Sequence, residues 1–226
     1  MPYLCQGGVL GLERIDVLVP WANAFAPKYT TYKGFWGLIV ALLLSSCASP
    51  PSKPGDICSI FLEKEDWYAS AKASAERWKA PIAVQMAIIN HESAFVDDAR
   101  PPRVRFLGIP LWRPTSAYGY SQATDSTWER YQKKTGNSGS DRDDFGDAID
   151  FVGWYMQQSQ LELGLSKSDA YKQYLAYHEG QGGYQRGSWR DNPSLQNTAR
   201  KVAATASRYQ QQLSSCQTEL NRSMDD

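Results

Sequence analysis

Apolar residues in the last three quarters of the chain recur every three or four positions, the spacing of amphipathic helices. Ile82, Met86 and Ile89 form one such stripe, and similar stripes follow toward the C-terminus. No segment alternates convincingly as a strand, and no internal repeat is visible. We therefore expect an all-α fold with a single domain of roughly six helices. The predicted helices cover residues 65–80, 81–95, 126–135, 144–163, 166–183 and 192–216.

Capping residues support several of these boundaries. Ser126 and Ser166 each precede an acidic residue by three positions, which is the capping-box pattern of a helix start. Gly136 and Gly164 follow two of the stripes, where glycine commonly ends a helix. Asn192 stands before a proline at the start of the last predicted helix. The apolar stripes and the capping residues thus predict the same helices.

Residues 97–122 interrupt the helical pattern. This stretch, "DDARPPRVRFLGIPLWRPTSAYGYSQ", is rich in proline and glycine and has no apolar stripe. Connections within compact domains are usually much shorter, and long ones are often binding loops. We expect this loop to contribute to a binding site.

The residues before position 47 have the features of an export signal. Lys28 and Lys33 precede the apolar run in "GFWGLIVALLLSSC", which is short for a membrane-spanning helix. Its end, "LSSC", resembles the lipobox at which bacterial lipoproteins are lipidated on cysteine and cleaved. We predict an N-terminal extension and lipoprotein signal over residues 1–46 and a lipid anchor on Cys47. The alternatives are a short membrane anchor and a chance apolar run.

The remaining cysteines suggest where the domain begins and ends. Residues 47–57 include the polar, proline-rich stretch "ASPPSKPG" and are expected to form a tether. Cys58 and Cys216 bracket the helical part, and an exported protein meets oxidising conditions, which favours a disulfide over two unpaired cysteines. The predicted helical domain therefore spans residues 58–216, followed by a polar tail over residues 217–226.

Composition limits the classes of partner. The chain has 24 basic and 24 acidic residues and a formal net charge of zero, with no long run of one sign. This charge balance argues against a nucleic-acid-binding protein. The 8 Trp and 13 Tyr residues fit a helical core with tyrosines at its edge, but a few of them could equally line a sugar groove.

Glu92 is the first candidate for chemistry. It extends the apolar stripe that runs through Ile89 and lies at the end of a predicted helix. Burial disfavours a charged carboxylate, and so does the C-terminal end of a helix. Both effects raise the pKa of the carboxyl, as a general acid near neutral pH requires. A glutamate at a helix end is more often solvent-facing, so Glu92 alone does not identify an active site.

Two further segments place polar side chains where the chain turns. Gly119 turns the loop and delivers Gln122 just before a helix, while Tyr177 and His178 precede the glycine-rich turn in "HEGQGG". Taken singly, Gln122 reads as a turn residue and the glycine-rich stretch as an ordinary helix cap. The case for an active site depends on the three segments occurring together in this order.

In this order the segments resemble the soluble lytic transglycosylases, lysozyme-like enzymes that cut the glycan strands of bacterial cell walls. That family carries a Glu-Ser pair at a helix end, a Gly-x-x-Gln segment and an Ala-Tyr-Asn-x-Gly segment. The corresponding stretches here are Glu92-Ser93, Gly119-Tyr-Ser-Gln122 and Ala176-Tyr-His-Glu-Gly180. The resemblance covers nearly all of the predicted domain and implies a lysozyme-like fold acting on peptidoglycan.

By this resemblance, Glu92 is the catalytic acid/base, and Ser93 and Gln122 shape the sugar subsites. The resemblance also puts Tyr177 near the glutamate, where it orients the carboxyl. His178 is placed among the substrate-binding residues, although it stands where the family has asparagine, so that contact could differ. Ser121 likewise replaces an apolar residue of the family, which could change how its segment packs.

The implied reaction cleaves the MurNAc–GlcNAc β-1,4 bond and leaves 1,6-anhydro-MurNAc ends, with no cofactor and no metal. Ordinary glycosidases use two carboxylates, whereas here only Glu92 has a convincing setting, and Glu179 lies in a polar stretch. A hydrolytic muramidase of the goose-lysozyme kind and a non-catalytic peptidoglycan-binding lipoprotein remain open. A metal site at the two His-Glu pairs lacks the His-Glu-x-x-His spacing.

The expected partners are peptidoglycan glycan strands and, through the lipid on Cys47, a membrane. Nucleic acid is not expected. The residue after Cys47 is alanine, and bacterial lipoproteins without aspartate at that position usually go to the outer membrane. We therefore expect the protein on the periplasmic face of the outer membrane.

Overall fold

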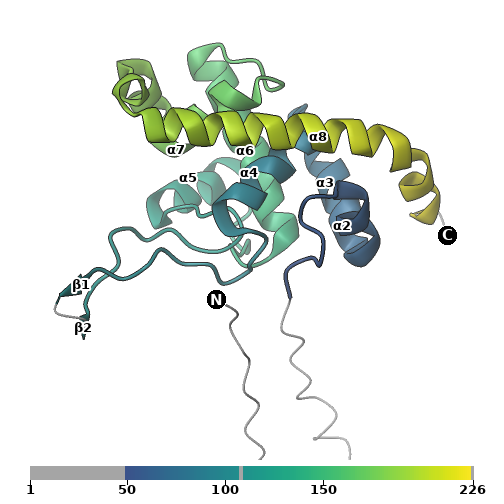
Figure 1. Cartoon of the computed structure of the whole chain (residues 1–226), viewed down its shortest axis with the longest axis horizontal. Coiled ribbons are helices and arrows are strands. Elements are labelled where there is room, and N and C mark those ends of the chain that lie inside the picture. The colour runs from purple at the N-terminus through teal and green to yellow at the C-terminus, as the bar shows by residue number, and fades with distance from the viewer. Residues whose placement is uncertain (1–48, 107–108, 225–226) are drawn as a thin grey trace, which may run out of the picture. The chain divides into compact units, whose positions relative to one another are not determined.

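A long C-terminal helix lies across the other helices in the computed structural model, which describes residues 49–106 and 109–224 (Figure 1). The all-α prediction is confirmed, although this part of the chain holds one more α-helix than expected and a short hairpin. The elements are α2 (Ile57–Glu63), α3 (Glu65–Trp78), α4 (Ile82–Ser93), β1 (Arg105–Phe106), β2 (Ile109–Pro110), α5 (Asp125–Thr135), α6 (Phe145–Leu163), α7 (Ala170–Arg186), the 3-10 helix η2 (Ser188–Asp191) and α8 (Pro193–Ser223).

Helix α8 is 31 residues long and packs against α2, α4 and α7 (Figure 1). Its predicted apolar stripe, Leu195, Val202, Tyr209 and Leu213, is buried in the core. Burying large apolar side chains along one face stabilises such a helix far more than its intrinsic propensity does. The helix also continues through residues 217–223, where a polar tail was expected, because Leu220 is buried at the end of the same stripe.

Helices α3 and α6 approach each other closely at Gly153. A Cβ atom at this position would lie 2.6 Å from the Ser74 hydroxyl, so only glycine fits. The same hydroxyl lies 2.7 Å from Oε1 of Gln85 and 3.0 Å from the Ile149 carbonyl, and Gln85 Nε2 donates to the Ala80 carbonyl. These buried polar groups are therefore satisfied where α3, α4 and α6 meet.

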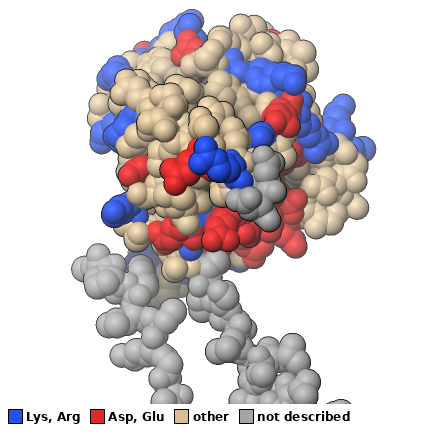
Figure 2. Space-filling view, turned by 90° about the vertical axis from the view of Figure 1, so that its right-hand side faces the viewer, with Lys and Arg blue, Asp and Glu red and all other residues tan. Residues whose placement is uncertain are grey.

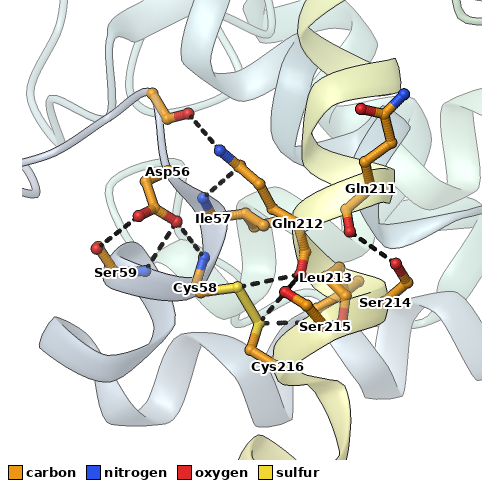
Figure 3. The surroundings of a disulfide bond; sticks show 11 residues. Asp56, Ile57, Cys58, Ser59, Gln211, Gln212, Leu213, Ser214, Ser215 and Cys216 are labelled. Atoms are coloured by element: carbon orange, nitrogen blue, oxygen red, sulfur yellow. Dashed lines mark hydrogen bonds between the residues drawn. A yellow bond between two sulfur atoms is a disulfide. The ribbon is translucent and has the colours of Figure 1, made fainter.

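The predicted disulfide between Cys58 and Cys216 is present and joins α2 to α8 (Figure 3). Cys58 lies within α2, however, and not before the first helix as the sequence suggested. Asp56 caps α2 by accepting hydrogen bonds from the backbone N–H groups of Cys58 and Ser59. The covalent link thus connects the two ends of the helical domain.

The proline-rich segment before α2 packs on the domain instead of standing free. The Tyr209 hydroxyl donates to the Pro54 carbonyl, and Gln212 Nε2 donates to the Gly55 carbonyl. Ser52 donates through its backbone N–H to a Glu63 carboxylate oxygen at 2.8 Å. At least residues 52–55 of the predicted tether are therefore held by hydrogen bonds.

Some of the predicted helix starts were wrong. Helix α5 begins after Thr124, so the capping box at Ser126 does not form, and Asp169 rather than Ser166 caps α7 through its own carboxylate. The capping-box pattern alone does not decide which of several nearby polar residues stands at the N-cap. Asn192 caps α8 as predicted, and Gly136 and Gly164 end α5 and α6 in left-handed conformations.

Charged side chains of both signs are scattered over the face shown in Figure 2, in keeping with the zero net charge of the chain. No helix within the described ranges is long and apolar enough to cross a membrane. The predicted signal and the lipid anchor at Cys47 lie outside the described residues.

Candidate active site

Glu92 lies in the last turn of α4, where the chain reverses direction. The helix ends at Ser93 because Ala94 and Phe95 adopt left-handed conformations, with φ of 52° and 62°. Phe95 is fully buried and packs against Trp67, with the ring centroids 5.6 Å apart. Anchoring Phe95 in the core therefore fixes the turn that presents Glu92 at the edge of the domain.

The Glu92 side chain is only partly exposed to solvent. The residue as a whole is partly exposed, but its Oε1 atom is buried and has no hydrogen-bond partner among the described residues. Burial raises the pKa of Glu92 to about 7, against a smaller opposing effect of the nearby Tyr174 hydroxyl. The carboxyl can therefore hold a proton, and release it, near neutral pH.

Gly119 and Gln122 form a tight turn in which position 119 has to be glycine. Gly119 has a φ of +75°, and a Cβ atom there would lie 2.0 Å from the Arg142 carbonyl oxygen. Its N–H donates to the Ala99 carbonyl at 3.0 Å. Gln122 Nε2 donates to the carbonyls of Ala99 and Gly119, both at 2.8 Å. The Gln122 side chain thus closes the turn of which it is part.

The third segment lies at a break in α7. Gly180 has non-helical dihedrals, with φ of 73° and ψ of 158°, and Tyr177 and His178 precede it. The Tyr177 hydroxyl donates to the Ser121 carbonyl at 2.6 Å, and its ring packs edge-on against Tyr155 at 4.9 Å between centroids. Burial, and then the negative charge of Glu92, raise the pKa of Tyr177 well above its usual value. Tyr177 therefore remains protonated and acts as a donor.

The three segments meet at one open cavity of about 390 Å³, within the size range of ligand sites. Four of the five residues assigned to catalysis or substrate binding line it: Glu92, Gln122, Tyr177 and His178. Ser93 does not; it is buried, with its hydroxyl 3.2 Å from the Ile89 carbonyl, and its predicted role in binding sugar stays a prediction. The other lining residues are Pro101, Thr115, Ala117, Ala123, Thr124, Thr127, Phe151, Tyr155, Glu179 and Gly180.

Phe151 and Tyr155 are cavity residues that the sequence did not single out. They lie four residues apart, one helical turn, on α6. Tyr174, near Glu92, likewise stands three residues before Tyr177 on α7. Helical spacing from Tyr177 could have indicated Tyr174, but nothing local marks which α6 residues face the cavity.

Glu179 is a second carboxylate at the same cavity, although its polar stretch of sequence suggested capping or solvation. Its Oε1 lies 3.2 Å from His178 Nδ1, and its Oε2 accepts a hydrogen bond from the Ser188 hydroxyl. The Ser188 hydrogen bond, and more weakly His178, hold the pKa of Glu179 below its usual value. The cavity therefore presents one carboxyl that is ionised and another, Glu92, that is protonated up to near neutral pH.

Ser121, the serine that replaces an apolar residue of the related sequences, is fully buried. Its hydroxyl has no hydrogen-bond partner among the described residues, while its carbonyl accepts from Tyr177. Within the described ranges, no three His, Cys, Asp or Glu side chains lie close enough together to hold a metal ion.

Comparison with known proteins gives one match. A family model described as "Transglycosylase SLT domain" matches residues 35–216, most of the chain. No curated protein and no solved structure matches the sequence.

Proposed function

The chain belongs to the transglycosylase SLT domain family, and we propose that it cleaves the MurNAc–GlcNAc β-1,4 bond of peptidoglycan with formation of 1,6-anhydro-MurNAc ends. Membership of this lysozyme-like family gives the general function, a lytic transglycosylase type of action on peptidoglycan. The observation that carries the finer proposal is the Glu92 carboxyl, which has a buried oxygen and a pKa of about 7 in an open cavity.

In the first half-reaction, protonated Glu92 gives its proton to the glycosidic oxygen, and the bond from that oxygen to C1 of MurNAc breaks. The N-acetyl oxygen of MurNAc assists by bonding to C1, so the substrate supplies the nucleophile. A raised pKa suits this step, because a carboxyl with an ordinary pKa would already be ionised at neutral pH.

In the second half-reaction, the Glu92 carboxylate takes the proton from the C6 hydroxyl of the same MurNAc. The oxygen of that hydroxyl then bonds to C1 and displaces the N-acetyl oxygen, which closes the 1,6-anhydro ring. Glu92 ends protonated, as it began, and no water is consumed. One residue with a pKa near neutrality can therefore serve as acid and then as base.

In this proposal four further residues position groups or bind substrate: Tyr177, Gln122, His178 and Ser93. Tyr177 supports the turn that carries Gln122, and the side chains of Gln122 and His178 border the cavity that would take the sugars. Ser93 is adjacent to Glu92 but hydrogen-bonds within its own helix, which favours an indirect contribution.

The proposal is tested with Glu92→Gln on purified cell-wall sacculi. This change removes the proton but keeps the size of the side chain, and losing general acid/base catalysis typically costs about 10²–10⁴ in rate. We expect the upper end of this range or more, since both half-reactions depend on Glu92. The matched control is Glu129→Gln, an exposed glutamate on α5 that lies outside the cavity. Wild-type turnover by Glu92→Gln would contradict the assignment.

A second candidate reaction is hydrolysis of the same bond by a muramidase mechanism. Glu179 is the observation that favours it, because hydrolytic glycosidases pair an acid with an ionised carboxylate. Hydrolysis adds one water and leaves a reducing MurNAc end, so its products are heavier by one water. Product mass therefore separates the two reactions.

For its location, we propose that the mature protein is anchored by a lipid on Cys47 at the periplasmic face of the outer membrane. The "LSSC" stretch and the alanine after Cys47 support this. Cys47→Ala is expected to release the protein from the membrane fraction. A variant that fractionates like the wild type would mean that another segment holds the protein there.

A further inference from the structure

A β-hairpin projects away from the helical body on the side opposite the C-terminus (Figure 1). Arg105 pairs with Pro110 in β1 and β2, and the pairing extends outside the strands, with Leu111 N–H donating to the Val104 carbonyl at 2.8 Å. Val104 N–H donates in turn to the Trp112 carbonyl at 2.8 Å. These bonds stabilise both arms of the hairpin.

Large apolar side chains of the hairpin arms are exposed. Phe106 and Trp112 are 65% and 63% exposed, and Val104 and Leu111 are 39% and 38% exposed. Val104 and Phe106 are two residues apart and so lie on one face, and Leu111 shares that face because it is hydrogen-bonded opposite Val104. Contiguous exposed apolar residues on a projecting element usually mark a contact surface.

The hairpin and its base also carry positive charge that forms no ion pair with the described residues. Residues 99–124 contain no aspartate, glutamate or lysine. None of the arginines in this stretch forms an ion pair with the described residues. Strand alternation puts Arg103 and Arg105 on the face opposite Val104 and Phe106. The four arginines of the stretch are Arg100, Arg103, Arg105 and Arg113.

We propose that this hairpin docks on an anionic phospholipid surface. The face of Val104, Phe106 and Leu111 enters the boundary between headgroups and acyl chains, and the arginines reach back to the lipid phosphates. Sugar-binding surfaces commonly place side-chain amides or carboxylates beside their aromatic rings to bind hydroxyl groups, whereas the only polar side chains of residues 102–112 are Arg103 and Arg105. Apolar and arginine side chains together fit a charged lipid interface better.

The hairpin and the candidate active site are directly connected. Pro101 and Thr115, at the base of the two arms, line the cavity that contains Glu92. Docking of the arms would therefore hold the cavity at a fixed distance from the membrane surface. This contact is independent of the proposed reaction and of the lipid on Cys47, since it involves only residues of the folded domain.

The direct test is amide hydrogen exchange of the full chain with vesicles. Exchange in peptides covering residues 100–113 reports the hairpin separately from any contribution of the N-terminal segment. We expect exchange there to slow several-fold on vesicles of phosphatidylethanolamine with phosphatidylglycerol, and less on phosphatidylcholine alone. Equal exchange with and without the anionic vesicles would overturn the proposal.

Variants then identify the groups that bind. Arg105→Gln should weaken vesicle binding about fivefold, and Phe106→Ser with Leu111→Ser, both on the apolar face, should weaken it about tenfold or more. The matched controls are Lys133→Gln and Leu161→Ser, which change an exposed cation on α5 and an exposed leucine on α6. Unchanged vesicle binding of the hairpin variants, with lost cleavage of soluble glycan, would show that the hairpin binds substrate instead.

Discussion

The Tyr177 hydroxyl on α7 donates a 2.6 Å hydrogen bond to the backbone carbonyl of Ser121. This bond joins two sequence segments that are 56 residues apart and that both border the cavity containing Glu92. Since the Ser121 carbonyl is at the turn that Gln122 closes, the geometry of that turn depends on a residue of α7. Tyr177 is thus a positioning residue for the turn as well as a wall of the cavity.

Tyr177→Phe should therefore weaken catalysis and folding together. The change leaves the Ser121 carbonyl without its donor, at a cost of about 1–3 kcal/mol in the free energy of unfolding. A turn displaced by less than about 1 Å can lower kcat by up to roughly a hundredfold. Denaturant unfolding and turnover of sacculi measure the two effects. Tyr171→Phe, on the same helix but outside the cavity, is the control and should change neither.

The pKa of Glu92 predicts how stability depends on pH. The ordinary value is 4.5 and the folded value is about 7, so the folded protein binds the proton more tightly than the unfolded chain. The free energy of unfolding should accordingly fall as pH rises from 4.5 to 7, by about 3 kcal/mol at about 1.4 kcal/mol per pKa unit. This contribution is complete below pH 4.5 and lost above pH 7.

The comparison with Glu92→Gln isolates that contribution. The variant should match the wild type near pH 4 and become the more stable of the two toward pH 8, as measured by chemical denaturation at each pH. A pH-independent difference for Glu92→Gln would mean that the carboxyl titrates normally.

Glu179→Gln separates a structural carboxylate from a catalytic one. In the transglycosylase mechanism Glu179 only anchors His178 and Ser188, so kcat should fall by less than about tenfold. In a hydrolytic mechanism it would activate water, and the loss should approach the roughly 10²–10⁴ typical of general base catalysis. Initial rates on sacculi, with product masses from the same digests, distinguish these outcomes.

Cys216→Ser tests the disulfide. The bond closes a loop with a sequence separation of 158, and removing such a bond typically costs about 2–5 kcal/mol. The variant should lose the difference in mobility between reducing and non-reducing gels and unfold at lower denaturant concentration. Two reactive thiols in native exported wild-type protein would contradict the pairing.

The sequence predicted those features of the fold that local pattern determines. The stripe through Leu195 and Leu213 gave helix α8, and Gly136 and Gly164 end their helices as expected, because helical spacing and capping depend on near neighbours. The hairpin at Arg105 was missed because strands of two residues are too short to show alternation. Helix α2 was missed for a similar reason, because its seven residues are too few to show a clear helical stripe.

For the candidate site, the sequence indicated only those residues that belong to the three motifs. Glu92, Gln122 and Tyr177 line one cavity as the motifs implied. The polar stretch around Glu179 suggested capping or solvation, because the Ser188 hydroxyl that fixes Glu179 is nine residues away, beyond the end of α7. Tyr155 contributes through the packing of α6 on α7, a tertiary contact that no local pattern specifies.

The mass of the glycan ends that the wild-type protein releases from purified sacculi tests the central claim most directly. Attack of the C6 hydroxyl oxygen on C1 predicts 1,6-anhydro-MurNAc ends, each lighter by one water than a hydrolytic product, with no solvent oxygen incorporated from ¹⁸O-labelled water. Reducing MurNAc ends that carry the label as the main product would contradict the account and establish hydrolysis in its place.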